Sequence, residues 1–355
     1  MDATVTKGAG EATAPMSPPP LAGGGRGAGA MRGDAPPAPS PITPPPQPSP
    51  ARGEGVASRS PHAREGVLRA SLAAWGLVLP SLVLLVAFTH WPAVETLWDS
   101  LHATPRGSRP AAFVGLDNYR ALLDDPVFLR ALWNNTIYAA VTIPASVILA
   151  LVMALAVNRT MPGRAVLRMA YFLPTMLPMI AVANIWLFFY TPDYGLFDQV
   201  LSLFGLGRHN WLGDAATALP AIIAVTVWKE AGFFMIFYLA ALQTMPPDLH
   251  EAASLDGTPR FMFFRRVTLP LLMPTTLFVL VNAVVNAFRM IDHVVVMTRG
   301  GPDNATTLLL YYIYETGFRF WDTATAATLT VVLLAILASL AVLQFGVFGR
   351  RVHYR

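Results

Sequence analysis

Six long apolar stretches dominate this sequence and limit what it can fold into. They cover about 71–91, 131–157, 166–190, 217–242, 271–293 and 324–348. Each is long enough to cross a hydrocarbon layer of about 30 Å, which takes roughly 20 helical residues. The alternating pattern of a membrane β-barrel is absent. Because a chain in lipid must satisfy its backbone hydrogen bonds internally, the stretches predict an all-α membrane protein with six transmembrane helices.

The composition agrees with a membrane chain and excludes several other classes. Hydrophobic residues make up 54% of the sequence and charged residues 13%, whereas about 25% charged residues is ordinary for a soluble protein. Cysteine is absent, which excludes a disulfide scaffold and any site built on thiolate ligands. No metal site and no nucleic-acid partner are predicted.

Residues 1–70 differ sharply from the rest of the chain. They hold 14 of the 31 prolines and 11 of the 26 glycines, and they have no unbroken apolar segment. Such a segment cannot build a core, so we expect a disordered Pro/Gly-rich cytoplasmic tail at 1–70 and a membrane domain at 71–355. A proline-rich docking arm and an overlong gene start, with Met16 or Met31 as the true start, remain alternatives.

The distribution of lysine and arginine predicts the orientation. With the tail inside, the inner connections carry nine such residues and the tail seven, against eight in the outer connections. This bias places both termini in the cytoplasm. Pro144, Pro174, Pro178 and Pro220 fall inside or near the start of predicted spans, where proline kinks a helix.

Polar residues inside the spans are the candidates for a pathway. Lys229 and Glu230 lie near the middle of the fourth span, where a charge costs about 2.5–3.5 kcal/mol. Neighbours on a helix point about 100° apart, so at least one of them should meet another helix or a water-filled path. A translocation pathway and a buried structural ion pair both remain open. The candidate pathway residues are Trp228, Lys229, Glu230, Tyr238, Asn282 and Asn286; bonding between helices is the alternative role for the asparagines.

The connection between the fourth and fifth spans has a distinctive pattern. Pro246-Pro247 followed by Asp248 is typical of a helix start, and Gly257 is typical of a helix end. Thr258-Pro259 then begins a second short helix. The pattern predicts a helix pair that projects from the bilayer, with an amphipathic loop at the membrane surface as the alternative.

The same segment carries a family signature. Glu251-Ala252-Ala253, three residues, Gly257, nine residues and Val267-x-Leu269-Pro270 resemble the EAA motif of permease subunits of binding-protein-dependent ABC importers, with Val in place of the usual Ile. In that family the loop is a coupling helix seated in the ATP-binding subunit. The resemblance assigns this role to 246–266 and its motif residues Glu251, Ala252, Ala253, Asp256, Gly257, Leu269 and Pro270.

Other segments resemble the sugar and glycerol-3-phosphate branch of that family. They are Trp91-Pro92, 114–119, 241–246 and Gly300-Gly301-Pro302 with the residues that follow. The resemblance runs from about 71 to 348, with a core at 131–348, and implies the fold of a type I importer permease.

The resemblance also implies a function and an assembly. The chain would be a multi-pass protein of the bacterial inner membrane that forms the translocation pathway for a sugar or oligosaccharide, or alternatively for glycerol-3-phosphate. It would work with a second permease, two ATP-binding subunits and an extracytoplasmic solute-binding protein. That protein would dock on the outer connections 92–130 and 294–322, in which Gly300, Gly301 and Pro302 form a turn.

The energy source is expected on another polypeptide. A P-loop needs lysine after glycine, and the only two lysines, Lys7 and Lys229, do not fit. We therefore expect no enzymatic activity and no cofactor on this chain, with ATP and Mg²⁺ bound by a partner subunit. An ion-driven secondary transporter, which also uses broken helices and charges inside the membrane, is the alternative.

Overall fold

The structure is a computed structural model of the 355-residue chain, and it describes residues 74–105, 107, 111–159, 161–205 and 209–348. Over these ranges the chain is helical, with one isolated bridge between His102 and Phe113 and no strand. By internal contacts the chain separates into residues 1–69 and 70–355. The predicted disordered tail, 1–70, lies outside the described residues.

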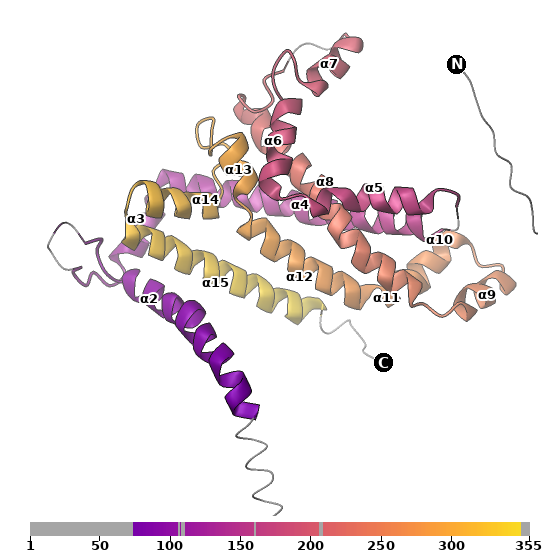
Figure 1. Ribbon diagram of the computed structural model, residues 1–355, viewed down its shortest axis with the longest axis horizontal. Coiled ribbons are helices and arrows are strands. Elements are labelled where there is room, and N and C mark those ends of the chain that lie inside the picture. Colours follow the sequence, from indigo (N-terminus) through magenta and orange to yellow (C-terminus); the bar gives the residue numbers. More distant parts are fainter. Residues whose placement is uncertain (1–73, 106, 108–110, 160, 206–208, 349–355) are drawn as a thin grey trace, which may run out of the picture. The chain divides into compact units, whose positions relative to one another are not determined.

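Five helices in the described ranges are long and apolar enough to cross a membrane (Figure 1). They are Ala74–Asp99, which includes η1 (Val86–His90) and α2 (Trp91–Asp99); α4 (Pro126–Asn158); α8 (Ala215–Gln243); Met273–Met297, which includes α12 (Met273–Arg289) and α13 (Asp292–Met297); and α15 (Thr323–Phe348). A sixth crossing results when α5 (Arg164–Met176) and α6 (Met179–Phe189) count as one span. The prediction of an all-α fold with six apolar crossings is confirmed on that count.

The third crossing is not the single helix predicted over 166–190. α5 and α6 meet at a bend of 103°, and Leu177 between them is extended, with φ −84° and ψ 138°. Pro178 explains the break, because proline drives the residue before it out of the helical region and offers no N–H to the preceding turn. Pro144 and Pro220 lie inside α4 and α8, which continue through them.

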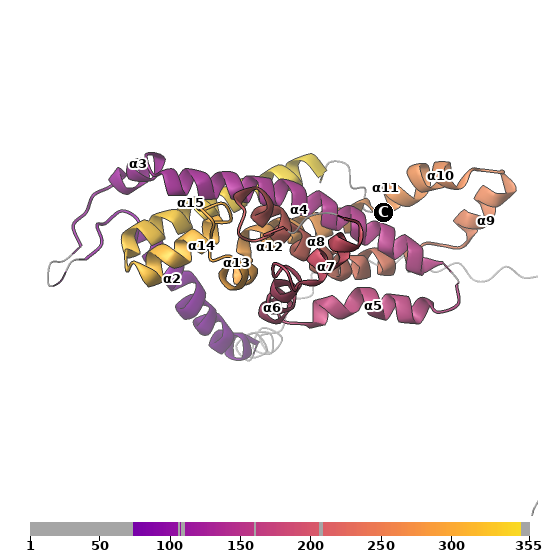
Figure 2. The same ribbon diagram turned by 90° about the horizontal axis from the view of Figure 1, so that it is seen from above.

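α4 and α8 form the core of the membrane domain, and Figures 1 and 2 both show them side by side. In the most apolar window of α8 61% of the residues are buried, whereas none are in Ala74–Asp99. Ala150 and Ala154 of α4 are fully buried beside Phe234 and Tyr238 of α8. Since lipid tails are as apolar as leucine, close contact at small residues holds such helices together.

Short helices fill the connections between the crossings. Figures 1 and 2 place α9 and α10 beyond one end of α4 and α8, and α3 and α14 at the opposite end. The bounds are α3 (Asp117–Leu123), α7 (Leu196–Leu203), α9 (Asp248–Leu255), α10 (Arg260–Phe263), η2 (Phe264–Thr268), α11 (Leu269–Leu271), α14 (Leu309–Tyr314) and η3 (Glu315–Arg319).

Candidate functional site

The middle of α8 carries two adjacent charged residues that are both buried. Lys229 and Glu230 are 8% and 7% exposed. The Lys229 ammonium donates to the carbonyl oxygens of Leu177, at 2.6 Å, and Pro174, at 3.2 Å. The Glu230 carboxylate accepts a 2.7 Å hydrogen bond from Nδ2 of Asn286 on α12. The sequence predicted that at least one of the two charges would meet another helix; Lys229 meets the end of α5, Glu230 meets α12, and the two are not paired with each other.

A second polar group lies one turn earlier on α8 and was not predicted. The Tyr138 hydroxyl of α4 is 2.8 Å from Oγ1 of Thr226 and 3.1 Å from Nε2 of His293 on α13. All three side chains are buried, and His293 Nδ1 has no hydrogen-bond partner among the described residues. Polar residues inside apolar spans were the available signal, but only tertiary structure shows which of them meet.

A small cavity adjoins both polar groups. Its volume is about 10 Å³, which is roughly the space that one water molecule needs. Its polar lining comes from three helices: Thr142 and Ser146 of α4, Thr226 and Glu230 of α8, and Asn286 of α12. The polar residues at the centre of the bundle thus enclose room for a water but not for a sugar.

Trp228 opens onto a larger groove. This groove lies between α4 and α8, has a volume of about 500 Å³ and is lined almost entirely by apolar side chains, among them Ile137, Val141 and Val227. Trp228 is 41% exposed, and its ring meets Trp186 of α6 edge to face at 5.5 Å. Of the six candidate pathway residues, Trp228 is the one that lines this groove.

The remaining two candidates do not join this site. The hydroxyl of the fully buried Tyr238 donates to Oγ1 of Thr276 at 3.2 Å, about two helical turns along α8 from Glu230. The Asn282 amide donates to the carbonyl of Phe278 on its own helix at 2.8 Å. The six residues predicted as one pathway are therefore spread over several separate contacts.

The EAA segment folds as the helix α9 followed by a glycine turn. Gly257 has φ +63°, its N–H bonds to the carbonyl of Ser254 at 3.2 Å, and the N–H of Thr258 bonds to that of Ala253 at 2.9 Å. This is the Schellman arrangement that ends many helices and favours glycine at the left-handed position. The predicted end of the helix at Gly257 is confirmed.

No residue of α9 is buried, and the motif residues are reached from outside. Glu251, Ala252, Asp256, Gly257 and Pro270 are exposed, while Ala253 and Leu269 are half-buried. The second short helix predicted after Thr258-Pro259 begins as expected with α10 at Arg260, but it does not end separately, because η2 and α11 continue it up to Leu271. They therefore precede the fifth crossing, Met273–Met297, and join it through a turn at Leu272.

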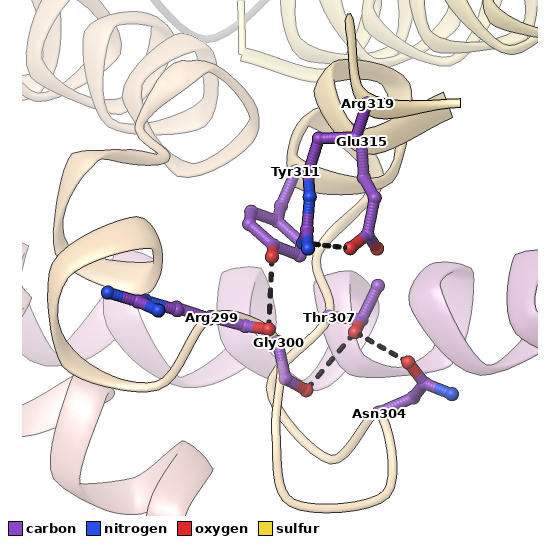
Figure 3. A network of polar contacts seen from close by, with 7 residues as sticks. All are labelled: Arg299, Gly300, Asn304, Thr307, Tyr311, Glu315 and Arg319. Atoms are coloured by element: carbon purple, nitrogen blue, oxygen red, sulfur yellow. Dashed lines mark hydrogen bonds and ion pairs between the residues drawn. The ribbon is translucent and has the colours of Figure 1, made fainter. Parts of the chain in front are cut away.

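The Gly300-Gly301-Pro302 segment forms a tight loop (Figure 3). Gly300 is buried with φ +81°, and its carbonyl oxygen accepts from the N–H of Thr306 and lies 3.1 Å from the Thr307 hydroxyl. A Cβ at Gly300 would approach Thr307 Oγ1 to 2.6 Å and the Tyr311 ring to 2.8 Å. Gly300 therefore shapes the loop from inside instead of forming its outer surface.

The exposed part of this loop consists of residues that lie in the predicted docking connection 294–322 but were not singled out from the sequence. Arg299, Asp303 and Asn304 are exposed and have left-handed backbones, with φ of 51°, 47° and 58°. Nδ2 of Asn134 on α4 donates to the carbonyl oxygens of Asn304, at 2.7 Å, and Thr307, at 3.1 Å. The loop is thus tied to α4 while it displays a charged and polar tip.

The connection after α6 is organised around Asp198 of α7, also missed from the sequence. This buried carboxylate accepts hydrogen bonds from the N–H of Asp193 and Nε1 of Trp211, both at 3.1 Å, and from the N–H of His209 at 3.4 Å. Burial raises the pKa of the Asp198 carboxyl, but these bonds and the nearby His209 outweigh it and hold the pKa below its ordinary value.

Residues 128–354 match the family model of the binding-protein-dependent transport system inner membrane component. The chain belongs to this family. It is therefore a permease, an inner membrane component of a transport system and not an enzyme.

Curated relatives of this permease include two kinds of transporter subunit. It is 35% identical to the trehalose/maltose transport system permease protein MalF of Thermococcus litoralis over 77% of this chain and 93% of that protein. It is 33% identical to the sn-glycerol-3-phosphate transport system permease protein UgpA of Yersinia enterocolitica over 79% of this chain and 95% of that protein.

Solved structures share the fold of the permease. A chain of a bacterial ABC transporter involved in the import of the acidic polysaccharide alginate superposes with a TM-score of 0.72 at 22% identity, over 81% of this chain and 98% of that one. A chain of the alginate ABC transporter in complex with an alginate pentasaccharide-bound periplasmic protein gives a TM-score of 0.73, also at 22% identity.

Proposed function

We propose that this permease forms the pathway by which an ATP-driven importer takes up a neutral sugar or oligosaccharide. The observation that carries the proposal is the 35% identity with a trehalose/maltose permease over 77% of the chain. By analogy with the alginate transporter and its periplasmic protein, the importer receives its solute from an extracytoplasmic binding protein.

The groove beside Trp228 supplies suitable chemistry for such a solute. Aromatic faces pack against the C–H faces of sugars, and a few polar groups then fix orientation. Trp228 lines the groove along α4 and α8, and Trp186 packs against its ring edge to face. A second permease facing this groove would close it into a pathway, with Glu230 and Asn286 behind the wall.

Glycerol-3-phosphate is the second candidate, because permeases for it are 33% identical to this chain over 79% of its length. A phosphate ester calls for arginine or lysine donors. Lys229 lies beside the groove, but its ammonium is already bonded to two carbonyl oxygens. Because Lys229 already donates to these carbonyls, it is less suited to bind a phosphate, and an uncharged solute is favoured.

Energy in this proposal comes from two separate ATP-binding subunits, which bind ATP and Mg²⁺ and receive α9. The exposed α9 supports the coupling role, because none of its residues is buried and Leu249 and Leu255 leave apolar surface open at 37% and 90% exposure. Both termini then lie in the cytoplasm. The binding protein docks at the opposite end of the bundle. This end carries α3, α14 and the loop tip at Arg299, Asp303 and Asn304.

Reconstitution tests the proposal. The complex, purified through a tag on this chain and inserted into liposomes with the binding protein encoded beside it, should accumulate labelled trehalose or maltose only with Mg-ATP. Collapse of ion gradients by ionophores should leave uptake unchanged. Uptake of glycerol-3-phosphate alone would select the second candidate, and uptake by the isolated chain on an ion gradient would contradict the ATP-driven mechanism.

A further inference from the structure

The break between α5 and α6 leaves backbone carbonyls without helical donors. The carbonyl of Pro174 would normally accept from the N–H of residue 178, but Pro178 has none. Leu177 is extended, so its own carbonyl also lies outside a helix. A buried carbonyl without a donor is costly in lipid, where water cannot replace the missing bond. Both oxygens need a donor from elsewhere in the bundle.

Lys229 provides that donor for both. Its ammonium lies 3.2 Å from the Pro174 oxygen and 2.6 Å from the Leu177 oxygen. These groups form the C-terminal end of α5, where the helix dipole also favours a cation. Within the described part of the chain, no carboxylate lies within 4.0 Å of the ammonium, since Glu230 turns to Asn286. The partners of Lys229 are thus the two carbonyls of the break.

A second and independent contact fixes α5 at the same place on α8. Gly232 lies three residues after Lys229, and a Cβ added there would come within 2.2 Å of the Tyr171 backbone oxygen and 3.1 Å of the Thr175 side chain. The backbone of α5 therefore rests directly on α8 at Gly232. Such close approach needs glycine. Together, Gly232 and Lys229 hold the last two turns of α5 against one face of α8.

We propose that Lys229 is a positioning residue, which caps the broken third crossing and, with Gly232, sets the direction in which α6 leaves it. α6 carries Trp186 to the edge of Trp228 and packs against α13. If Trp228 lines the solute pathway, which rests on the function proposed above, Lys229 shapes one wall of that pathway without touching the solute. Its ammonium stabilises backbone carbonyls of the chain and does not bind the solute.

Spin labels can measure this role directly, because the chain has no cysteine. Labels at Val166→Cys on α5 and Phe188→Cys on α6 would occupy sites that are 65% and 63% exposed. With the 103° bend these positions lie about 20 Å apart, against about 33 Å for a straight helix. The measurement uses the full chain in its complex, with cysteine-free companion subunits, in lipid nanodiscs without solute or ATP.

Lys229→Met keeps the length of the side chain but removes its donors, and it should broaden the distance distribution and move its mean from the bent toward the straight value. Lys229→Arg keeps donors and charge and should restore the wild-type distribution. Gly232→Ala should shift the distribution by pushing α5 outward, which tests the same contact without changing charge. Glu230→Gln is the matched control at the same depth, because Glu230 faces α12 and should leave the distance unchanged.

A wild-type distribution in Lys229→Met would overturn the positioning role of Lys229, and one in Gly232→Ala would overturn the contribution of Gly232. A shift in Lys229→Met that arginine does not reverse would also overturn the role of Lys229. The distance measurement involves no solute, so its failure is separate from failure of the proposed function, which sugar uptake reports. A shifted distance in a complex that transports no sugar would leave the positioning role standing and remove the proposed solute.

Discussion

Asn286 of α12 donates a hydrogen bond of 2.7 Å to the carboxylate of Glu230 on α8. This contact links two crossings at a residue that is only 7% exposed. A hydrogen bond contributes only about 0.5–1.5 kcal/mol net, but a buried group left without its partner costs about 1–3 kcal/mol. Removing one partner of such a buried pair leaves the other unsatisfied, so the two helices depend on each other at this point.

Asn286→Leu should therefore destabilise the permease by about 1–3 kcal/mol, the cost of a buried acceptor left without its donor. The measurement is thermal unfolding of the purified chain in detergent. Asn282→Leu is the matched control, because Asn282 lies one turn earlier on α12 and bonds only to the carbonyl of Phe278. Equal losses of stability in the two leucine variants would show that the hydrogen bond to Glu230 contributes no more than the bond that Asn282 makes within its own helix.

Gly300→Ala should destabilise the loop that joins α13 to α14. Its φ of +81° lies in the left-handed region, and the added Cβ would meet Thr307 Oγ1 at 2.6 Å. Strain of this kind costs about 1–3 kcal/mol. The expected result is a lower melting temperature and faster proteolysis between residues 298 and 308.

Gly301→Ala is the control for this variant. Gly301 has no positive φ, and its added Cβ would meet only the Thr298 oxygen, at 3.3 Å. It should lose clearly less stability than Gly300→Ala. A larger loss at Gly301 would contradict the buried role assigned to Gly300.

Features set by local chemistry could be predicted from the sequence. Apolar length alone located the crossings, and the helix end at Gly257 followed from the preference of glycine for a left-handed backbone, observed at φ +63°. Pro174 and Pro178 were recognised as sites of kinking, but so was Pro144, which lies inside a continuous α4. A proline weakens a helix locally, and the packing around it determines whether the helix breaks.

Features set by distant partners could not be predicted. The position of Lys229 inside α8 indicated that its side chain needs a polar partner. The partners are the carbonyls of Pro174 and Leu177, which lie more than 50 residues away in sequence. The same holds for Tyr138, Thr226 and His293, which meet from three helices. Apolar periodicity shows that a residue is buried and leaves open what it contacts.

Asp198 makes the stability of the connection around α7 depend on pH. Its pKa in the folded chain lies below the ordinary 3.8, because hydrogen bonds to the charged form outweigh the effect of burial. The bonds therefore stabilise the fold at every pH above about 3.8, and this contribution is lost as the pH falls through the lower folded value. Asp198→Asn should lower the melting temperature at pH 7, and the gap to wild type should narrow only below pH 3.8.

Asp124→Asn is the control for that experiment, because Asp124 is an exposed carboxylate at the end of α3. Surface changes of this kind usually stay within about 0.5 kcal/mol. A gap between Asp198→Asn and wild type that stays constant from pH 7 down to pH 3 would mean that the charge of Asp198 does not stabilise the connection.

If α9 couples the permease to an ATP-binding subunit, as proposed above, its exposed apolar end predicts where the two proteins meet. Leu255 is 90% exposed, and α9 is fixed at its end by Gly257, so the side chain is presented on a defined helix. Leu255→Ser should leave the free energy of unfolding of the isolated chain within about 0.5 kcal/mol of wild type. If Leu255 anchors the contact, the variant should weaken binding of the ATP-binding subunit by about 2 kcal/mol, or roughly 30-fold.

Leu203→Ser is the matched control, because Leu203 on α7 is 83% exposed and lies in a different connection. Binding is measured by titrating the purified ATP-binding subunit onto the permease in nanodiscs. Leu203 lies outside the proposed contact with the ATP-binding subunit, so that subunit should bind Leu203→Ser with the same affinity as wild type. If both serine variants bind alike, α9 does not contact that subunit through Leu255, and the coupling surface must lie on α10 or on the connection between α4 and α5.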